Sequence, residues 1–306
     1  MSPVSLIIIV GISSFIHAAW NYMAKTIAAG STIFVWWIAF LVTILYAPLV
    51  IVYTTYYKIS LSNLQLYFLA GTAIIHLFYF LILQRGYQKS DLSVVYPIAR
   101  GTGPVLATLG AVYFLHESIS QAGIVGLFFV LIGIGLISEL PIFNLFYTND
   151  KNNIRLTDKN KLKTLELGIL YGLSTGIFIA CYTLLDAFAV RQLKIPILLV
   201  EYISHPFRVL MLLPFVARQP RHTLQLWQEY PRKLLLIALI CPLPFMLVLY
   251  ALQYAPVGYV APAREFSIVV GVFLGAKLLA EKNMTQRLIG ATCIVFGIII
   301  LSWAKL

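Results

Sequence analysis

Apolar residues run through this chain in long stretches that are separated by short groups of charged and turn-forming residues. A helix that crosses a bilayer needs about 20 mostly apolar residues, because each residue adds about 1.5 Å along the axis. Stretches of this length occur at 4–23, 32–53, 65–84, 92–114, 121–139, 166–185, 195–217, 233–253, 257–280 and 284–304. The sequence therefore predicts an all-α membrane protein with ten transmembrane helices. No lysine or arginine precedes the first stretch, so we interpret it as a helix of the mature protein rather than as a signal peptide.

The second half of the chain repeats the first. A shift of 164 residues needs no gap and aligns Ala99 and Arg100 with Ala263 and Arg264, Glu117 with Glu281, Gly126 with Gly290, and Gly133 with Gly297. Shifts of 165 and 161 extend the match to Pro97 with Pro262 and to Gly11 with Gly172. We expect one repeat at 1–139, a polar linker at 140–165 and a second repeat at 166–306.

Each repeat holds five predicted helices. Because five is odd, the second copy enters the membrane from the opposite side, and inverted repeats of this kind build many secondary transporters. The alternative is that duplication merely produced a larger helical bundle.

Composition supports a membrane protein and argues against a nucleic-acid-binding one. Charged residues make up 11% of the chain and hydrophobic residues 60%, whereas soluble domains carry roughly 25% charged residues. The net charge of +11 comes from basic residues scattered over short connections, which is typical of topology determinants. We expect the lipid bilayer and a small-molecule solute as partners, and no nucleic acid; monomer and dimer both stay open.

The distribution of these basic residues also predicts an orientation. One set of connections carries 15 lysines and arginines, and the opposite set, which includes both termini, carries 4. Since basic connections stay in the cytoplasm, the count places both termini outside.

Motifs for metal binding and catalysis are missing from the sequence. Cys181, Cys241 and Cys293 lie singly in apolar stretches, where they are typical core residues. No phosphate-binding glycine loop or nucleophile elbow occurs. We therefore expect no catalytic residue, metal or cofactor and no ATP-driven step, and we favour a transporter over a membrane enzyme or a scaffold.

Several short motifs carry a resemblance to a known family. They are His17, Trp20 and Asn21 in the first stretch, the segment from Tyr96 to Gly101 in the fourth, Glu117 before the fifth, and Pro262 and Glu281 in the second repeat. With these motifs the chain resembles EamA-type transporters of the drug/metabolite transporter superfamily. The resemblance implies ten helices in two five-helix domains and a small polar cargo that it does not specify.

Two arginines lie inside predicted spans, where an ionisable residue facing lipid costs about 2.5–3.5 kcal/mol. Arg100 lies about 12 Å into the fourth stretch and Arg264 about 10 Å into the ninth, at matching positions of the two repeats. We predict that both bind substrate from opposite sides of the membrane. The alternative is a structural ion pair or an arginine whose side chain extends to the membrane surface.

Residues that titrate point to a coupling site. Glu201, His205 and Arg208 are spaced so that they share one helical face, which suggests a proton relay centred on Glu201 and His205. Glu265, beside Arg264, is a second candidate. The alternative is that either glutamate forms an internal salt bridge with the arginines.

Polar and aromatic residues predict a ligand pocket. His17, Trp20, Asn21, His76 and Tyr96 are candidate substrate-binding residues, together with Tyr79, Tyr182 and Tyr202. A buried histidine or asparagine can equally serve only to satisfy neighbouring polar groups. We interpret Glu117 and Glu281 as structural residues that stabilise the start of the following helix.

These features together predict a secondary transporter of a small polar, anionic or zwitterionic metabolite, such as an amino acid. We expect it to work by alternating access, as an exporter in the plasma membrane, which in a bacterium is the inner membrane. A gradient-independent facilitator or exchanger is the alternative.

Overall fold

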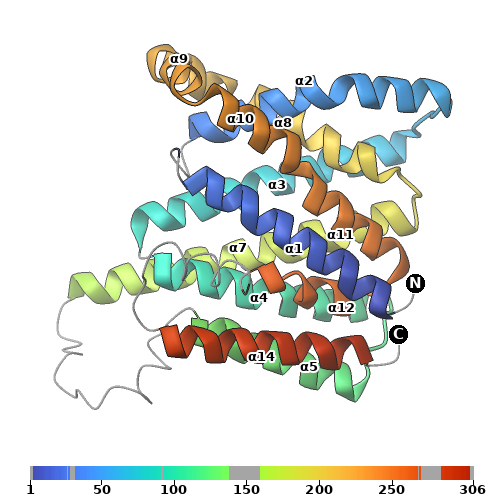
Figure 1. The fold of residues 1–306 in the computed structure, drawn as a ribbon, viewed down its shortest axis with the longest axis vertical. Helices are drawn as coiled ribbons and strands as arrows, with labels where there is room; N and C mark the ends of the chain where they lie inside the picture. Colours follow the sequence, from blue (N-terminus) through green and yellow to red (C-terminus); the bar gives the residue numbers. More distant parts are fainter. Residues whose placement is uncertain are drawn as a thin grey trace. The chain divides into compact units, whose positions relative to one another are not determined.

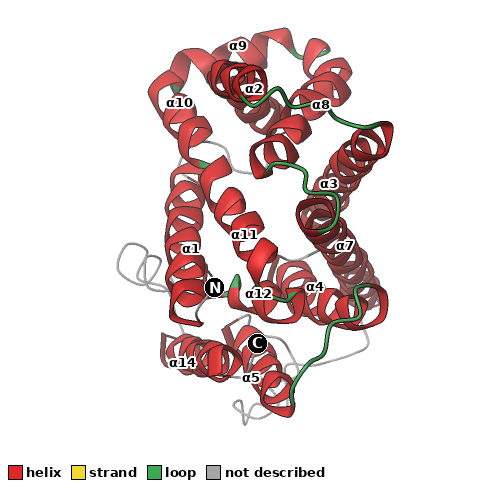
Figure 2. Ribbon diagram, turned by 90° about the vertical axis from the view of Figure 1, so that its right-hand side faces the viewer, coloured by secondary structure: helices red, strands yellow, loops and turns green. Residues whose placement is uncertain are grey.

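The computed structural model describes residues 3–25, 27, 32–90, 92–137, 159–267, 269 and 284–303, and all regular structure in these ranges is helical (Figures 1 and 2). The first half contains α1 (Pro3–Lys25), α2 (Thr32–Tyr56), α3 (Asn63–Lys89), α4 (Leu92–Phe114) and α5 (Gln121–Ile137). The second half contains α7 (Lys159–Arg191), α8 (Ile197–Ala217), α9 (Pro220–Glu229), α10 (Pro231–Ile240), α11 (Pro242–Tyr254), α12 (Val257–Ala263) and α14 (Met284–Trp303). The prediction of an all-α protein is confirmed for these residues.

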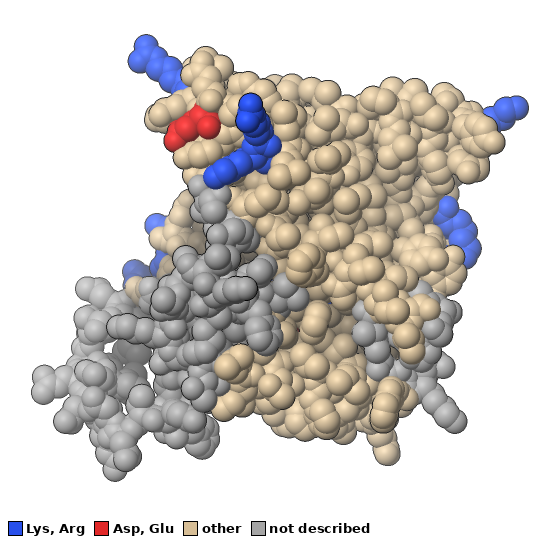
Figure 3. All heavy atoms as spheres, in the orientation of Figure 1, with Lys and Arg blue, Asp and Glu red and all other residues tan. Residues whose placement is uncertain are grey.

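Within the described ranges, five segments are long and apolar enough to cross a membrane: α2, α3, residues 166–191 of α7, α8, and α10 with α11. Large apolar side chains on these helices are exposed, including Leu49 and Ile51 of α2 and Phe215 of α8. Figure 3 shows broad uncharged surface, with the few lysines and arginines of that face near its margins. Exposed apolar side chains on long helices are what a lipid environment requires.

The predicted span 233–253 is broken in two. α10 ends at Ile240 and α11 begins at Pro242, with a turn at Cys241. Pro242 and Pro244 have no backbone N–H, so they cannot bond to the carbonyls one turn earlier. Side chains of other helices bond to carbonyls near this break: the Tyr46 hydroxyl donates to Leu239 O at 2.7 Å, and Ser13 Oγ donates to Pro244 O at 2.7 Å.

Two other boundaries differ from the sequence prediction. α7 begins at Lys159 and continues to Arg191, whereas the apolar pattern predicted 166–185. Charged residues such as lysine, glutamate and arginine are good helix formers, so the helix continues past the apolar stretch. A criterion based on hydropathy does not detect these charged ends of the helix. The sequence predicted a connection at 218–232, but the structure has the helix α9 there. A search for membrane spans does not find α9, because ten residues are too few to cross a bilayer.

Two compact units can be distinguished, and each takes helices from both halves of the chain. Unit 1 comprises 1–7, 78–184 and 255–306, and unit 2 comprises 8–77 and 185–254. The long helices α3 and α7 contribute residues to both units.

Unit 1 contains a close crossing of α5 and α14. A Cβ atom on Gly126 would lie 2.8 Å from the carbonyl oxygen of Gly297, and a Cβ on Gly133 would lie 2.5 Å from the carbonyl oxygen of Gly290. Only glycine permits this approach of two backbones, as in other small-residue contacts between membrane helices. The two contacts exchange under the sequence repeat, because Gly126 corresponds to Gly290 and Gly133 to Gly297.

Unit 2 is built around α2, α8 and α10. Its core includes Phe34, Ile38 and Val42 of α2 with Leu234 and Ile237 of α10. The indole of Trp36 donates to Val209 O of α8 at 3.2 Å, and the Tyr202 hydroxyl donates to Thr43 O at 3.1 Å. These bonds hold α2 and α8 against one another. Each of them is the second helix of its predicted repeat.

The arrangement of ten helices in two inverted repeats stays a prediction. The break at Cys241 and the extra helix α9 change the number of helical segments, and most of 268–283, which holds the end of the predicted ninth span, lies outside the described residues.

Candidate functional site

Arg100 of α4 forms an ion pair within unit 1. Its Nη1 lies 3.4 Å from Oε1 of Glu265, and its Nη2 donates to Ser267 Oγ at 3.4 Å. The Glu265 side chain is 4% exposed and that of Arg100 is 17% exposed. Arg100 therefore has its charge balanced inside the protein, in agreement with the ion-pair alternative that the sequence left open.

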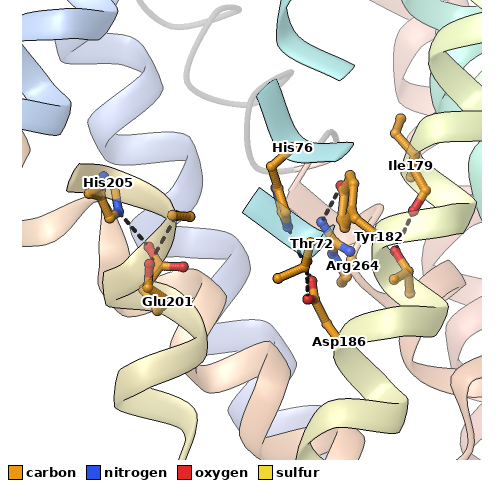
Figure 4. Close-up of polar contacts among 10 residues, drawn as sticks. Thr72, His76, Ile179, Tyr182, Asp186, Glu201, His205 and Arg264 are labelled. Carbon is orange, nitrogen blue, oxygen red and sulfur yellow. Dashed lines mark hydrogen bonds and ion pairs between the residues drawn. The ribbon is translucent and has the colours of Figure 1, made fainter. Parts of the chain in front are cut away.

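Arg264 is in a different environment from Arg100, although the two occupy equivalent positions in the repeats. It follows α12, and its Nη2 donates to the Tyr182 hydroxyl at 3.4 Å, with the guanidinium 6.0 Å from the Tyr182 ring centroid (Figure 4). Tyr182 contacts Tyr79 edge to face, with 5.6 Å between ring centroids. Among the described residues, no carboxylate lies within ion-pair distance of Arg264.

Glu265 has one carboxylate oxygen engaged and one without a hydrogen-bond partner in the described part of the chain. This oxygen, Oε2, is buried. Among the described residues, Arg264 thus has no carboxylate within ion-pair distance, and the adjacent Glu265 has one carboxylate oxygen without a hydrogen-bond donor. Glu265 interacts electrostatically with Arg264 as well as with Arg100.

Glu201 and His205 form a pair along α8 in unit 2. Nε2 of His205 lies 3.0 Å from Oε1 of Glu201, and both side chains are buried (Figure 4). The predicted sharing of one helical face is confirmed for these two residues. Nδ1 of His205 and Nε of Arg208 are buried without hydrogen-bond partners among the described residues.

Asp186 is a buried acidic residue that the sequence analysis did not consider. Its Oδ1 accepts a hydrogen bond of 2.5 Å from Thr72 Oγ1, and its Oδ2 lies 3.1 Å from Nε2 of His76 (Figure 4). The predicted sixth helix ended at residue 185, one position too early to include it. An aspartate next to a run of apolar residues was the signal that could have identified it.

Parts of the chain are similar to two families of membrane transporters. Residues 166–303 match the model of the EamA-like transporter family, and residues 35–131 match that of the Small Multidrug Resistance proteins. These two matches support an EamA-type transporter of the drug/metabolite transporter superfamily, and both families are transporters rather than enzymes. The family match and the apolar helices support a multi-pass integral membrane protein.

No curated protein matches this chain. A solved structure described only as "Crystal structure of protein" resembles it with a TM-score of 0.66 and 10% sequence identity, over 98% of this chain and 99% of the other. At this identity the likeness concerns the fold alone.

The other residues that the sequence predicts for the substrate pocket lie on α1 and α4. His17 and Trp20 contact edge to face on α1, with 5.3 Å between ring centroids, and Trp20 Nε1 is buried without a hydrogen-bond partner among the described residues. Asn21 and Tyr96 lie on α1 and α4, and their side chains are outside the described set.

Glu117 caps a helix other than the predicted one. Its two carboxylate oxygens accept the backbone N–H groups of Val257 at 3.0 Å and Gly258 at 3.3 Å, at the start of α12. The sequence did not predict this contact, because only the folding of the chain brings the start of α12 within reach of Glu117. Its structural role, as a carboxylate at a positive helix end, fits the same physical principle. Glu281, its counterpart in the second repeat, lies outside the described residues.

Proposed function

We propose that this EamA-like transporter is a secondary transporter that exports a small zwitterionic or anionic metabolite, with an amino acid as the best-fitting class. The observation that carries this proposal is the contrast between the two arginines. Arg100 forms an ion pair with Glu265, whereas Arg264 donates a hydrogen bond to the neutral Tyr182 hydroxyl and interacts with Glu265 only beyond ion-pair distance.

The chemistry of Arg264 favours a carboxylate or phosphate ligand. A guanidinium presents a planar set of donors that match two oxygens of such a group, and the hydrogen bonds strengthen away from water. The next residue, Glu265, offers its carboxylate oxygen Oε2 as an acceptor for an ammonium group of the ligand. A ligand that carries both groups would satisfy both side chains, so an α-amino acid fits better than a simple anion.

The repeated architecture supports alternating access. α4 packs against α12, and the two glycine contacts between α5 and α14 exchange under the repeat. Inverted repeats provide two nearly equivalent packings of the same elements, which is the physical basis of inward-facing and outward-facing states. His17, Trp20, Asn21, His76 and Tyr96 stay proposed contributors to the substrate pocket.

Transport without a nucleotide site must draw on an ion gradient or on exchange. Glu201, His205 and Glu265 stay proposed coupling residues, and a gradient-independent exchanger or facilitator is the second candidate. We expect the protein in the plasma membrane, where such a gradient is maintained.

The test uses the purified full-length protein in two steps. Thermal unfolding is first measured with L-amino acids, dicarboxylates and phosphorylated sugars, because binding to the native state raises apparent stability. Counterflow of each stabilising compound is then measured in proteoliposomes. We expect Arg264→Gln to abolish stabilisation and counterflow, and Arg264→Lys to retain a fraction of both.

Arg218→Gln is the matched control, since Arg218 lies exposed after the end of α8. It should leave both measurements unchanged. Full counterflow by a folded Arg264→Gln variant would contradict the assignment of Arg264, and absence of counterflow with every compound would contradict the proposed substrate classes.

A further inference from the structure

The short helix α9 of unit 2 is amphipathic and is held against α2. The indole of Trp37 donates to Thr223 O of α9 at 2.9 Å, and the rings of Trp37 and Trp227 stack with 5.0 Å between centroids. Leu226 and Trp227 pack against the core of unit 2, whereas Arg221 lies on the opposite face and is exposed. α9 also contacts α10, so the exposed side chains of α9 and of the start of α10 form one surface.

This surface carries an excess of positive charge. Arg221 of α9 and Arg232 and Lys233 of α10 are exposed, and we call these three residues the basic surface. Figure 3 shows charged side chains over the part of the molecule where Figure 1 places α9 and the start of α10. Glu229 is the acidic residue in this stretch, and its carboxylate accepts a hydrogen bond from the Tyr230 hydroxyl. Three positive charges against one negative charge favour an anionic partner.

Structural roles within the protein do not account for the basic surface. In the part of the chain that the structure describes, Arg221 and Arg232 take part in no ion pair. Both lie in the first turn of their helices, where a positive charge is unfavourable because it faces the positive end of the helix dipole. Lys233 Nζ lies 5.4 Å from the centroid of the Tyr230 ring. The two arginines therefore do not stabilise the helices that carry them.

Apolar side chains adjoin the basic surface. Leu235 and Leu236 of α10 are 39% and 47% exposed, and Leu224 of α9 is 55% exposed. Three residues separate Arg232 from Leu235, which is about 4.5 Å along the helix axis. α10 also begins one of the five segments that are long and apolar enough to cross a membrane. The surface thus changes from positive to apolar within about one helical turn, as a phospholipid changes from a charged headgroup to acyl chains.

We propose that the basic surface binds the headgroups of anionic phospholipids. Its arginines and its lysine donate to phosphate oxygens, and the acyl chains cover Leu235 and Leu236. A free anion would use only the charges and would leave the leucines uncovered. An acidic protein would have to enter the bilayer to reach them. This inference does not depend on the proposed transport function, because it concerns only lipid binding and its effect on stability.

The test titrates lipid into the purified full-length protein in a non-ionic detergent and follows thermal unfolding. Phosphatidylglycerol is compared with phosphatidylcholine of the same acyl chains and with inorganic phosphate. Binding to the native state raises the apparent melting temperature. We expect phosphatidylglycerol to raise it at lower concentrations than phosphatidylcholine does, and inorganic phosphate to have no such effect. Added salt should weaken the preference for phosphatidylglycerol, because salt screens exposed charges.

The double variant Arg232→Gln, Lys233→Gln tests the basic surface directly. Each basic residue near a membrane surface strengthens the binding of anionic lipid about fivefold, so half-maximal stabilisation should need about 25-fold more phosphatidylglycerol. Its response to phosphatidylcholine should not change. The double variant Lys58→Gln, Lys194→Gln is the matched control, because it removes the same charge from exposed residues in the connections after α2 and α7. Its titration with phosphatidylglycerol should match that of the unmodified protein.

Both double variants change exposed side chains, so both should unfold near the temperature of the unmodified protein when no lipid is added. If Arg232→Gln, Lys233→Gln does not fold, Arg221→Gln tests the same surface from α9, with an expected shift of about fivefold. An equal response of the unmodified protein to the two lipids, or an unchanged titration of the folded variants, would overturn the proposal. Stabilisation by inorganic phosphate at the same concentrations would also overturn it and would indicate a site for a free anion.

Discussion

Arg100 and Glu265 form a buried ion pair between residues that are 165 positions apart in the chain. The pair joins α4 of the first half to the segment after α12 of the second half, so it ties the two halves together inside unit 1. Because Glu265 is nearly fully buried, its charge depends on compensation by Arg100, to which Arg264 adds a further electrostatic contribution.

We expect Arg100→Gln and Glu265→Gln each to lower the apparent melting temperature. Loss of one partner from a buried pair costs about 3–5 kcal/mol in soluble proteins, and the partial exposure of Arg100 should reduce that cost. The double variant Arg100→Gln, Glu265→Gln should be more stable than Arg100→Gln alone, because no buried charge is left unpaired. Thermal unfolding in detergent checks this, and strictly additive losses would show that the two side chains do not interact.

The contact of Glu117 with α12 gives a second prediction. Glu117→Ala removes the acceptor of two backbone N–H groups and should destabilise the protein by about 1–2 kcal/mol. Glu117→Gln keeps one acceptor oxygen and should lose less. Ser118→Ala, at an exposed neighbouring position, is the control and should match the unmodified protein in thermal unfolding. Equal stability of Glu117→Ala and the control would argue against the cap.

The close crossing of α5 and α14 gives a third prediction. Gly133→Ala places a Cβ 2.5 Å from a backbone carbonyl, which cannot move aside as a flexible side chain could. The helices must separate, and we expect a clear loss of thermal stability. Gly71→Ala of α3 is the matched control, because a Cβ there meets nothing within 4 Å. Alanine favours helix over glycine by about 1 kcal/mol, so this control should be neutral or stabilising in the same unfolding assay.

The orientation predicted from the basic residues can be tested on α9. His222 of α9 and Lys58 after α2 are both exposed, and the count of lysines and arginines places them on opposite sides of the membrane. In a variant without native cysteines, His222→Cys should react with an impermeant thiol reagent only in inverted vesicles. Lys58→Cys should react only in intact cells. The reverse pattern would place both termini in the cytoplasm.

The apolar pattern predicted most helices because the bilayer imposes a length and a composition on each span, and both are local properties of the sequence. It could not predict the break at Cys241 in a continuous apolar stretch, since Pro242 can be tolerated within a membrane helix when neighbouring side chains satisfy the freed carbonyls. The apolar pattern also could not predict α9. This helix has ten residues, and its stability does not depend on crossing a membrane.

The amino-acid sequence by itself determined the membrane-embedded class, the internal repeat and the candidate ionisable residues, because each depends only on residue type and spacing. Tertiary structure decided which partner each ionisable residue has. Arg100 and Arg264 are equivalent in the repeat, yet one faces Glu265 and the other Tyr182, and Asp186 meets His76 across 110 residues. Electrostatic interactions inside a low-dielectric interior depend on distances of a few ångströms between helices, and the order of residues along the chain does not specify those distances.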